Sequence, residues 1–306
     1  MGSSARTAGT RAAGGPPTVA RSARRAGSAP RPPRAGTIFD RTRTPLTVWF
    51  TACWQFASQK DGISALSLKR QLEIGSYQTA WAMLHRLRSV LVRPGRERLR
   101  GEVEVDESYF GGEEPGLAGG RAKGKKVLVG IAVERTDPKG FGRCRMAPLL
   151  DASGDSLRAF LIDNVEPGAR IVTDGWRSYP PATDGLYAHE PLPGASGAEA
   201  STLLPAVHKV ASLAKRWLLG THQGSVDEAH LPSYLNEFVF RFNRRRSRSR
   251  GLVFYRVLQL AAAHDPVRYR DLIANPRPGA APRQPPGTRG RPPSMERPPA
   301  GRPWRS

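Results

Sequence analysis

The spacing of hydrophobic residues along this chain changes once, from a helical period to a strand period, and this change limits the folds that the chain can adopt. Before the Pro94-Gly95 break, apolar residues recur at the spacing of helices, whereas after it short apolar and alternating runs are typical of strands. A segment with a helical period cannot bury its apolar side chains as a strand, and the reverse also holds. We therefore predict two folded domains, a helical domain over residues 37–98 and a second domain over residues 99–262.

The first domain is predicted to contain three short helices, over residues 45–59, 64–73 and 77–92. A turn that contains Gly75 separates the second helix from the third. Three short helices with such a turn are typical of a helix-turn-helix, a DNA-binding motif. A helical domain that serves only packing fits the same pattern, and the sequence leaves both interpretations open.

The second domain is predicted to be of the α/β class, with a mixed sheet flanked by helices. Three consecutive antiparallel strands are expected at residues 102–106, 127–133 and 145–150, followed by a helix at 155–164 and a strand at 170–173. Helices are expected again at 204–219, where Gly220 is the predicted stop, and at 228–243 and 254–264.

The two ends of the chain differ from the middle in composition. Residues 1–36 contain seven Arg and no acidic residue, and residues 276–306 are dominated by Pro and Arg. Such segments bury too little apolar surface to offset the entropy of ordering, so we expect disorder over residues 1–36 and, after a short helix end, over the rest of 263–306. A basic tail is often only a solvated tail, and the ends alone do not establish DNA binding.

Charge and cysteine content narrow the class of protein further. Lys and Arg outnumber Asp and Glu by 48 to 26, a net charge of +22, so a polyanion is the expected partner. Two cysteines without a C-x-x-C pair predict neither a disulfide framework nor a zinc site. We also find no apolar stretch of membrane-spanning length, and we expect no membrane association and a cytoplasmic location.

Two aspartates are the strongest catalytic candidates, because each follows a predicted strand and precedes small or flexible residues. Asp106 follows the first strand, and Asp174 follows the fourth and precedes Gly175. Strand ends expose side chains to a cleft, and paired carboxylates supply the oxygen ligands that Mg²⁺ or Mn²⁺ prefers. On spacing alone, however, an Asp before Gly at a strand end is usually just a turn residue.

Four motifs, in their order along the chain, carry a family resemblance: Val105 to Gly112 (VDESYFGG), Val172 to Tyr179 (VTDGWRSY), Lys215 to His222 (KRWLLGTH) and Tyr234 to Arg245 (YLNEFVFRFNRR). Together they resemble insertion-sequence transposases of the DDE superfamily, in the branch with a zinc ribbon and a helix-turn-helix ahead of the catalytic core. The resemblance covers roughly residues 37–262. It implies an RNase H-like core that uses two Mg²⁺ or Mn²⁺ ions to cut and transfer DNA strands.

Carried over to this chain, the resemblance makes Asp106 and Asp174 the first two metal ligands. In the family, the third ligand is an acidic residue, Asn or His that stands seven positions before a lysine, and His208 stands seven before Lys215. Nearly two helical turns separate the two, so both project from one helix face. Lys215 is expected to contact a phosphate or, alternatively, to be a solvated lysine. His208 is expected to bind metal, to position water or to hydrogen-bond the backbone.

DNA contacts are expected from basic residues in three places, because guanidinium groups match phosphate geometry. They lie on the third helix, next to the candidate lysine, and in the basic cluster of residues 241–250: Arg86, Arg88, Lys215, Arg216, Arg241, Arg244, Arg245 and Arg246. Trp176 and Trp217 are interpreted as core residues, with stacking on unpaired bases as the alternative. The implied partners are double-stranded DNA, both element ends and target, and further copies of the chain.

The chain departs from the family where the zinc ribbon is expected. An Arg-, Ala- and Pro-rich stretch stands there instead of paired cysteines, so we expect no zinc and incomplete recognition of the terminal repeats. The main hypothesis is a transposase, and a truncated copy of the element is one interpretation of its N-terminal stretch. One alternative is a DNA-binding relic without catalysis, and another is a nuclease that cuts DNA but never joins it.

Overall fold

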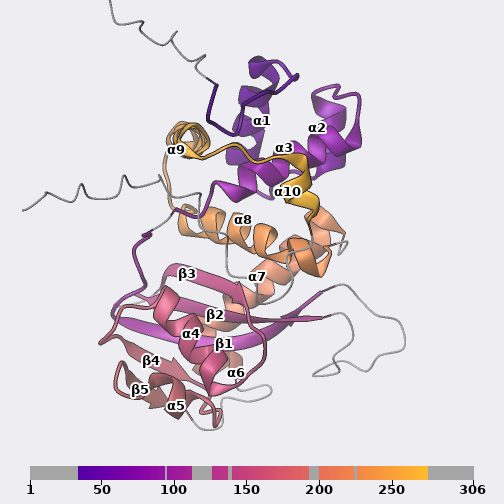
Figure 1. Ribbon diagram of the computed structural model, residues 1–306. Helices are drawn as coiled ribbons and strands as arrows, with labels where there is room; N and C mark the ends of the chain where they lie inside the picture. Colours follow the sequence, from indigo (N-terminus) through magenta and orange to yellow (C-terminus); the bar gives the residue numbers. More distant parts are fainter. Residues whose placement is uncertain are drawn as a thin grey trace, which may run out of the picture.

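The computed structural model describes residues 34–93, 95–111, 126–136, 140–192, 200–223 and 226–274. Nearly all of the two segments predicted to be disordered, residues 1–33 and 275–306, lie outside this range. In the described part, a helical unit lies above a sheet with helices on both faces, and α8 (Leu231–Asn243) lies between them (Figure 1). The predicted division into domains at residues 37–98 and 99–262 stays a prediction.

The helical unit confirms the three predicted helices within a few residues. They are α1 (Leu46–Ser58), α2 (Ala65–Gln71) and α3 (Tyr77–Ser89). The side chain of Ser64 begins α2 by accepting a hydrogen bond from the Ser67 N–H. In the turn between α2 and α3, the left-handed residue is Glu73, with φ of 51°, and not Gly75. The helix-turn-helix assignment of this unit stays a prediction.

The helical unit also contains α9 (Arg250–Ala263), a helix from the far end of the chain. Its buried residues Val253, Val257 and Ala261 share a hydrophobic core with α1 and α3. These residues fall in the range predicted for the second domain, 99–262. The helical unit therefore combines a segment that precedes the sheet in the sequence with one that follows it. Sequence order alone could not reveal this, because it requires a long-range contact.

The sheet has five strands in the order β3-β2-β1-β4-β5. β1 (Glu102–Phe110), β2 (Val127–Arg135) and β3 (Phe141–Pro148) pair antiparallel, as predicted. β4 (Arg170–Thr173) and β5 (Ala188–Pro191) add in parallel to β1. This mixed sheet, flanked by helices, is an RNase H-like α/β fold, and it confirms the predicted fold class.

The first strand is longer than predicted, and this changes the position of Asp106. β1 continues through Glu107, Ser108 and Tyr109 to Phe110, which pair with residues 127–130 of β2. Asp106 is therefore a mid-strand residue opposite Ile131 and does not end its strand. The polar residues after Asp106 gave no strand signal, but the pairing with β2 provides hydrogen bonds for them.

The two faces of the sheet are covered by different helices. α4 (Gly154–Asn164) and α5 (Tyr179–Thr183) cover one face, where Leu157, Phe160 and Tyr179 pack on β1 and β4. α7 (Pro205–His222) and α8 cover the other face, where Val207, Val210 and Phe238 pack on β1, β2 and β3. The central strand β1 is thus buried between two layers of helices.

Several element boundaries differ from those predicted. α7 does not stop at Gly220 but continues to His222, and Gln223 ends it with a left-handed φ of 53°. The short elements α5, β5, α6 (Ala200–Leu203) and α10 (Tyr269–Ile273) were not predicted, and residues 228–230 form a 3-10 turn before α8. Elements of four or five residues are too short to show a hydrophobic period.

A buried ionic cluster joins the helical unit to α8. Arg88 of α3 is 1% exposed, and its Nε lies 2.8 Å from Glu237 Oε2. Arg241 donates to the other carboxylate oxygen of Glu237 at 2.8 Å and to the backbone carbonyls of Gln59 and Phe56. Since Arg88 is buried and Arg241 is bonded to Glu237 and to two backbone carbonyls, the prediction that these two arginines contact DNA is corrected: they join α8 to the helical unit.

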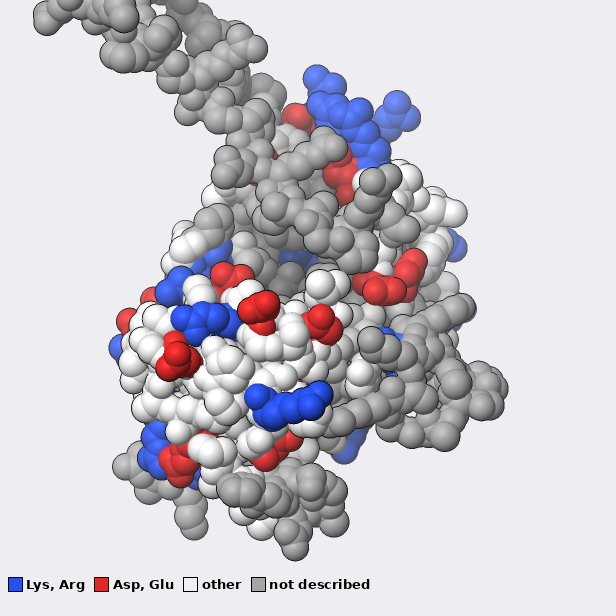
Figure 2. Space-filling model, turned by 60° about the horizontal axis from the view of Figure 1, so that its bottom comes forward, with Lys and Arg blue, Asp and Glu red and all other residues white. Residues whose placement is uncertain are grey.

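Within the described residues, no helix is both long enough and apolar enough to span a bilayer. The face at the β4–β5 end of the molecule carries acidic and basic side chains close to one another (Figure 2). Among the described residues of that face there is no continuous basic surface. The large positive net charge of the chain is therefore not concentrated there.

Candidate active site

The candidate active site lies on the face of β1 that looks toward α7. Side chains alternate along a strand, so Glu104, Asp106 and Ser108 all point to this face. Glu104 is fully buried, and its carboxylate accepts the N–H groups of Ala206 and Val207 at 2.7 and 3.1 Å. A carboxylate at the N-terminus of a helix satisfies free N–H groups there and complements the helix dipole. Glu104 thereby fixes the start of α7 on β1.

The fixed start of α7 sets the positions of His208 and Lys215. His208 Nε2 lies 3.8 Å from Asp106 Oδ2, and the two side chains are 34% and 20% exposed. One step further along β1, Lys215 Nζ donates a hydrogen bond to Ser108 Oγ at 2.7 Å. Partial burial lowers the pKa of Lys215, and the charge of Asp106 partly opposes this. The structure therefore brings Asp106, His208 and Lys215 together along one seam.

Asp174 is brought beside Asp106 by the parallel pairing of β4 with β1. Glu104 pairs with Val172, so the same register continued by two residues sets Asp174 level with Asp106. Neighbouring strands lie roughly 5 Å apart. β4 ends at Thr173, where Gly175 turns the chain with φ of 81° and the Trp176 N–H donates to Asp174 Oδ1 at 2.9 Å.

The electrostatics of Asp106 agree with this placement. Burial is the largest cause that raises the pKa of Asp106, and the negative charge of Asp174 raises it further. The Glu107 N–H, which donates to Asp106 Oδ1 at 2.8 Å, lowers it, as do His208 and Lys215. Two carboxyl groups that repel each other beside a partly buried strand form a site of strong negative potential.

Glu107 is a third carboxyl group near the pair, and it was not proposed as a site residue from the sequence. Its side chain points to the opposite face of β1, toward the fully buried Tyr179 of α5. Burial, followed by the charges of Asp106 and Asp174, raises the pKa of Glu107 to about 7. A buried carboxyl group with such a pKa is typical of a functional site, although structural clusters also produce it.

The residues present fit a divalent cation in part. Asp106 and Asp174 supply hard oxygen ligands, and the buried Nε2 of His208 has no hydrogen-bond partner among the described residues. Within the described ranges, however, no group of three or more His, Cys, Asp or Glu side chains is placed to hold a metal ion by itself. Two carboxylates suit Mg²⁺, which usually keeps several water ligands and binds through one or two carboxylates and the phosphates of a substrate.

Apart from Arg88 and Arg241, the predicted DNA-contacting residues fall into two groups in the structure. Lys215, Arg216 and Arg246 are exposed and can reach a bound polyanion. Three others are partly engaged within the protein. Arg86 Nε donates to the Val267 carbonyl at 2.8 Å, Arg244 lies over the Phe240 ring, and Arg245 donates to the carbonyls of Gly142 and Phe242.

The two tryptophans pack against the core, in agreement with their interpretation as core residues. Trp217 is partly buried against the core between the sheet and α7, and its Nε1 donates to the Asp61 carbonyl at 2.9 Å. Trp176 packs on the opposite face, against the core that contains Leu157 and Phe160.

The fold and the placement of the carboxylates define a class of protein, the RNase H-like proteins of the DDE type, with one aspartate on the central strand and another after the neighbouring parallel strand. Comparison with protein families agrees: residues 98–243 match the family described as the ISXO2-like transposase domain. This part of the chain, which contains the sheet, α7 and α8, is thus similar to a transposase domain.

A curated relative points the same way. An uncharacterized protein in the transposable element ISH50 of Halobacterium salinarum is 27% identical over 221 residues, which cover 68% of this chain and 73% of the relative. The aligned region is longer than the 146 residues that match the transposase domain.

Proposed function

We propose that this protein is an insertion-sequence transposase that cuts DNA at the ends of its element and joins the freed ends to target DNA. The observation that carries the proposal is the level placement of Asp106 and Asp174 on neighbouring parallel strands, inside an ISXO2-like transposase domain. The DNA substrate follows from the family and from the net charge of +22. The proposed function also implies that the protein acts on DNA in the cytoplasm. It implies further that several copies of the chain together hold both ends of the element.

Asp106 and Asp174 are the residues that would hold two Mg²⁺ or Mn²⁺ ions. When bound, such ions neutralise the charge that develops on the attacking and leaving oxygens of an in-line phosphoryl transfer. The chain itself supplies the positioning. Glu104 holds α7 against β1, so that His208 stays beside Asp106 and Lys215 stays beside Ser108. We propose that Lys215 contacts the phosphate next to the cut, with Arg216 beside it.

The role of His208 depends on what its ring faces. Nε2 faces Asp106 Oδ2, too far for a hydrogen bond but close enough to share a cation or a water molecule. Imidazole suits Mn²⁺ better than Mg²⁺. We therefore propose that activity with Mn²⁺ exceeds activity with Mg²⁺.

The experiment that tests the proposal compares strand cleavage and strand transfer by the wild type, Asp106→Asn and Asp174→Asn, with Mn²⁺ and with Mg²⁺. Asp184→Asn is a matched control, because Asp184 is an exposed aspartate at the end of α5 in the same domain. We expect metal-dependent products from the wild type and the control and at least a hundredfold loss in the two site variants. Equal activity in all four proteins would remove the proposed roles.

A second candidate function is DNA binding without catalysis. It is favoured by the absence, among the described residues, of a group of three ligands able to hold metal, and by His208 at the position of the third ligand. This alternative predicts salt-sensitive duplex binding and no metal-dependent nicking by the wild type. The same assay therefore separates the two functions.

A further inference from the structure

A second site candidate lies at the junction between the helical unit and the sheet, away from the paired aspartates. A cavity of about 350 Å³ opens there between the segment that leads from α3 to β1, strand β3, α8 and α9. Its lining is dominated by one residue type and contains six arginines: Arg93, Arg96, Arg143, Arg145, Arg244 and Arg256. Glu97 is the one acidic residue among the lining residues.

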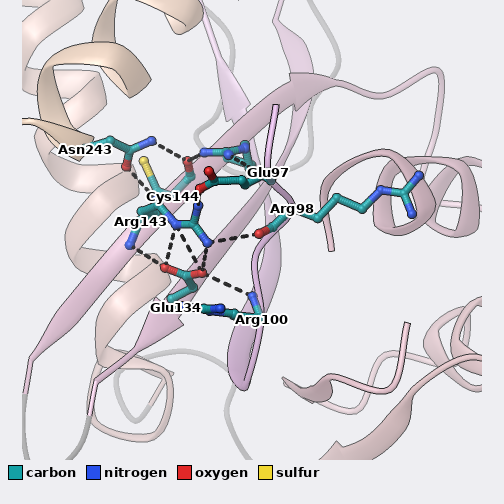
Figure 3. Close-up of polar contacts among 8 residues, drawn as sticks. Glu97, Arg98, Arg100, Glu134, Arg143, Cys144 and Asn243 are labelled. Carbon is teal, nitrogen blue, oxygen red and sulfur yellow. Dashed lines mark hydrogen bonds and ion pairs between the residues drawn. The ribbon is translucent and has the colours of Figure 1, made fainter. Parts of the chain in front are cut away.

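Most of these positive charges are not neutralised within the described part of the protein. Arg143 is neutralised, because it forms a 2.7 Å ion pair with Glu134 and a 3.0 Å ion pair with Glu97 (Figure 3). For the other five arginines, no carboxylate of the described residues lies within the 4.0 Å of an ion pair, although Asp163 acts on Arg96 from further away. Like charges gathered around a cavity without counter-charges are unfavourable unless an anion joins them.

Burial and the repulsion among these arginines lower the pKa values of Arg145 and Arg244. Burial, followed by the charges of Arg96 and Arg143, lowers the pKa of Arg145 to about 10. Burial, followed by the charges of Arg256 and Arg93, lowers the pKa of Arg244. The six side chains thus form two adjoining groups, one on the sheet side and one on the helical side of the cavity.

Arg145 also leaves a donor unused at the wall of the cavity. The residue is only 6% exposed, and its two terminal nitrogens donate to the carbonyls of Cys144 and Glu97 at 3.0 and 2.6 Å. Its Nε is buried and has no partner among the described residues. A buried charged donor without an acceptor is costly, and this cost adds to the repulsion among the arginines around the cavity.

We propose that this arginine cavity is a phosphate-binding site that takes backbone phosphates of duplex DNA and thereby holds the duplex across the junction of the two units. Phosphate oxygens match the guanidinium fork of the arginines that line the cavity. Two features favour DNA over a free phosphate compound. Arg93 lies exposed at the rim, and the exposed Arg246, Arg248 and Arg250 follow Arg244 along the turn between α8 and α9, a basic path suited to a polymer.

The inference rests on the proposed function only for the identity of the polymer, and it needs no catalysis. The test measures binding of the full chain to a mixed-sequence duplex of about 20 base pairs by fluorescence anisotropy across a salt series. The cavity variant is Arg93→Gln with Arg256→Gln, two arginines that line the cavity without holding the sheet. The control is Arg98→Gln with Arg100→Gln, which removes the same charge close by. Both control arginines are exposed, and the Arg98 side chain points away from the Arg143 cluster (Figure 3).

We expect the cavity variant to lose about tenfold in duplex affinity and its salt slope to fall by about 1 to 2, since each lost phosphate contact removes about 0.9 from the slope. The control should stay within about twofold of the wild type. Equal losses in the cavity variant and the control would overturn the inference, because a general electrostatic field would then suffice.

Titration with pyrophosphate and with ATP separates the two sources of phosphate. Tight binding of either compound, lost in the cavity variant while duplex affinity is retained, would contradict DNA as the ligand. The inference and the proposed function can also fail separately. If the wild type never nicks DNA but the cavity variant loses duplex affinity, only the transposase proposal is contradicted. If the wild type nicks DNA but the cavity variant binds the duplex as tightly as the wild type, only the inference about the cavity is contradicted.

Discussion

The substitution Glu107→Gln should make the protein more stable at high pH and leave its stability nearly unchanged at low pH. The pKa of Glu107 is raised from 4.5 to about 7, chiefly by burial and then by Asp106 and Asp174. Because the folded state favours the protonated form, Glu107 costs nothing below pH 4.5 and destabilises the protein progressively as the pH rises through about 7. Gln has the shape of the protonated acid but cannot ionise.

The magnitude follows from the shift of the pKa. About 2.5 pKa units correspond to about 3.4 kcal/mol, the upper limit of the stability that the charge of Glu107 removes at high pH. The linkage relation gives about 2 kcal/mol of this at pH 6 and about 3 kcal/mol at pH 8. A divalent cation held by Asp106 and Asp174 would reduce the effect, because it lowers the pKa of a neighbouring carboxyl group.

Urea unfolding of the wild type and Glu107→Gln at pH 4.5, 6 and 8 measures this difference directly. Glu166→Gln is the control, because Glu166 is an exposed glutamate on the same domain. The variant should gain stability relative to the wild type as the pH rises, and added Mn²⁺ should narrow the gap. A difference that stays constant across the three pH values would refute the assignment of the raised pKa to Glu107.

Three further predictions concern the buried ion pair between α3 and α8 and the residues of the candidate active site. Arg88→Met leaves the buried charge of Glu237 without one of its two partners, so the free energy of unfolding should fall by about 3 kcal/mol in chemical denaturation. Glu104→Gln weakens the attachment of α7, and strand cleavage should fall at least tenfold with a smaller loss of duplex affinity, whereas equal losses would argue against a positioning role. His208→Glu adds a carboxylate beside Asp106, so activity with Mg²⁺ should rise relative to Mn²⁺, and an unchanged metal preference would separate His208 from the metal.

Much of the fold could be predicted because its long elements carry clear periods. The helices α1, α3 and α4 and the strands β2 and β4 lie close to their predicted positions, since their apolar residues repeat over two or more turns or fill a buried run. The end of β1 was missed because its last residues are polar. Their pairing with β2 is a long-range property, which a local pattern cannot show.

The site was predictable in part for a similar reason. Asp106, Asp174, His208 and Lys215 were found from motifs, and the structure brings His208 and Lys215 to β1 as the common helix face requires. Glu104 gave a usable signal, because a carboxylate at an inward position of a central strand needs a buried partner. Arg88 gave none: an arginine in a helix looks the same from the sequence whether it faces DNA or a buried glutamate.

The arginine cavity shows why the function of a basic segment could not be predicted from that segment alone. Residues 241–250 look like one DNA-binding cluster, yet Arg241 and Arg245 bond to the protein while Arg244 faces a cavity shared with Arg96 and Arg145. The cavity is assembled from the segment before β1, from β3 and from the α8–α9 region, three parts that are far apart in the chain. Only the packing of the two units brings them together.

The central claim is that Asp106 and Asp174 bind the same cation. Anomalous diffraction from crystals grown with Mn²⁺ measures this directly. The account predicts a manganese peak within about 2.5 Å of an oxygen of each aspartate, and no such peak in Asp174→Asn. Carboxyl groups on opposite sides of the sheet, or more than about 12 Å apart with manganese bound elsewhere, would contradict it.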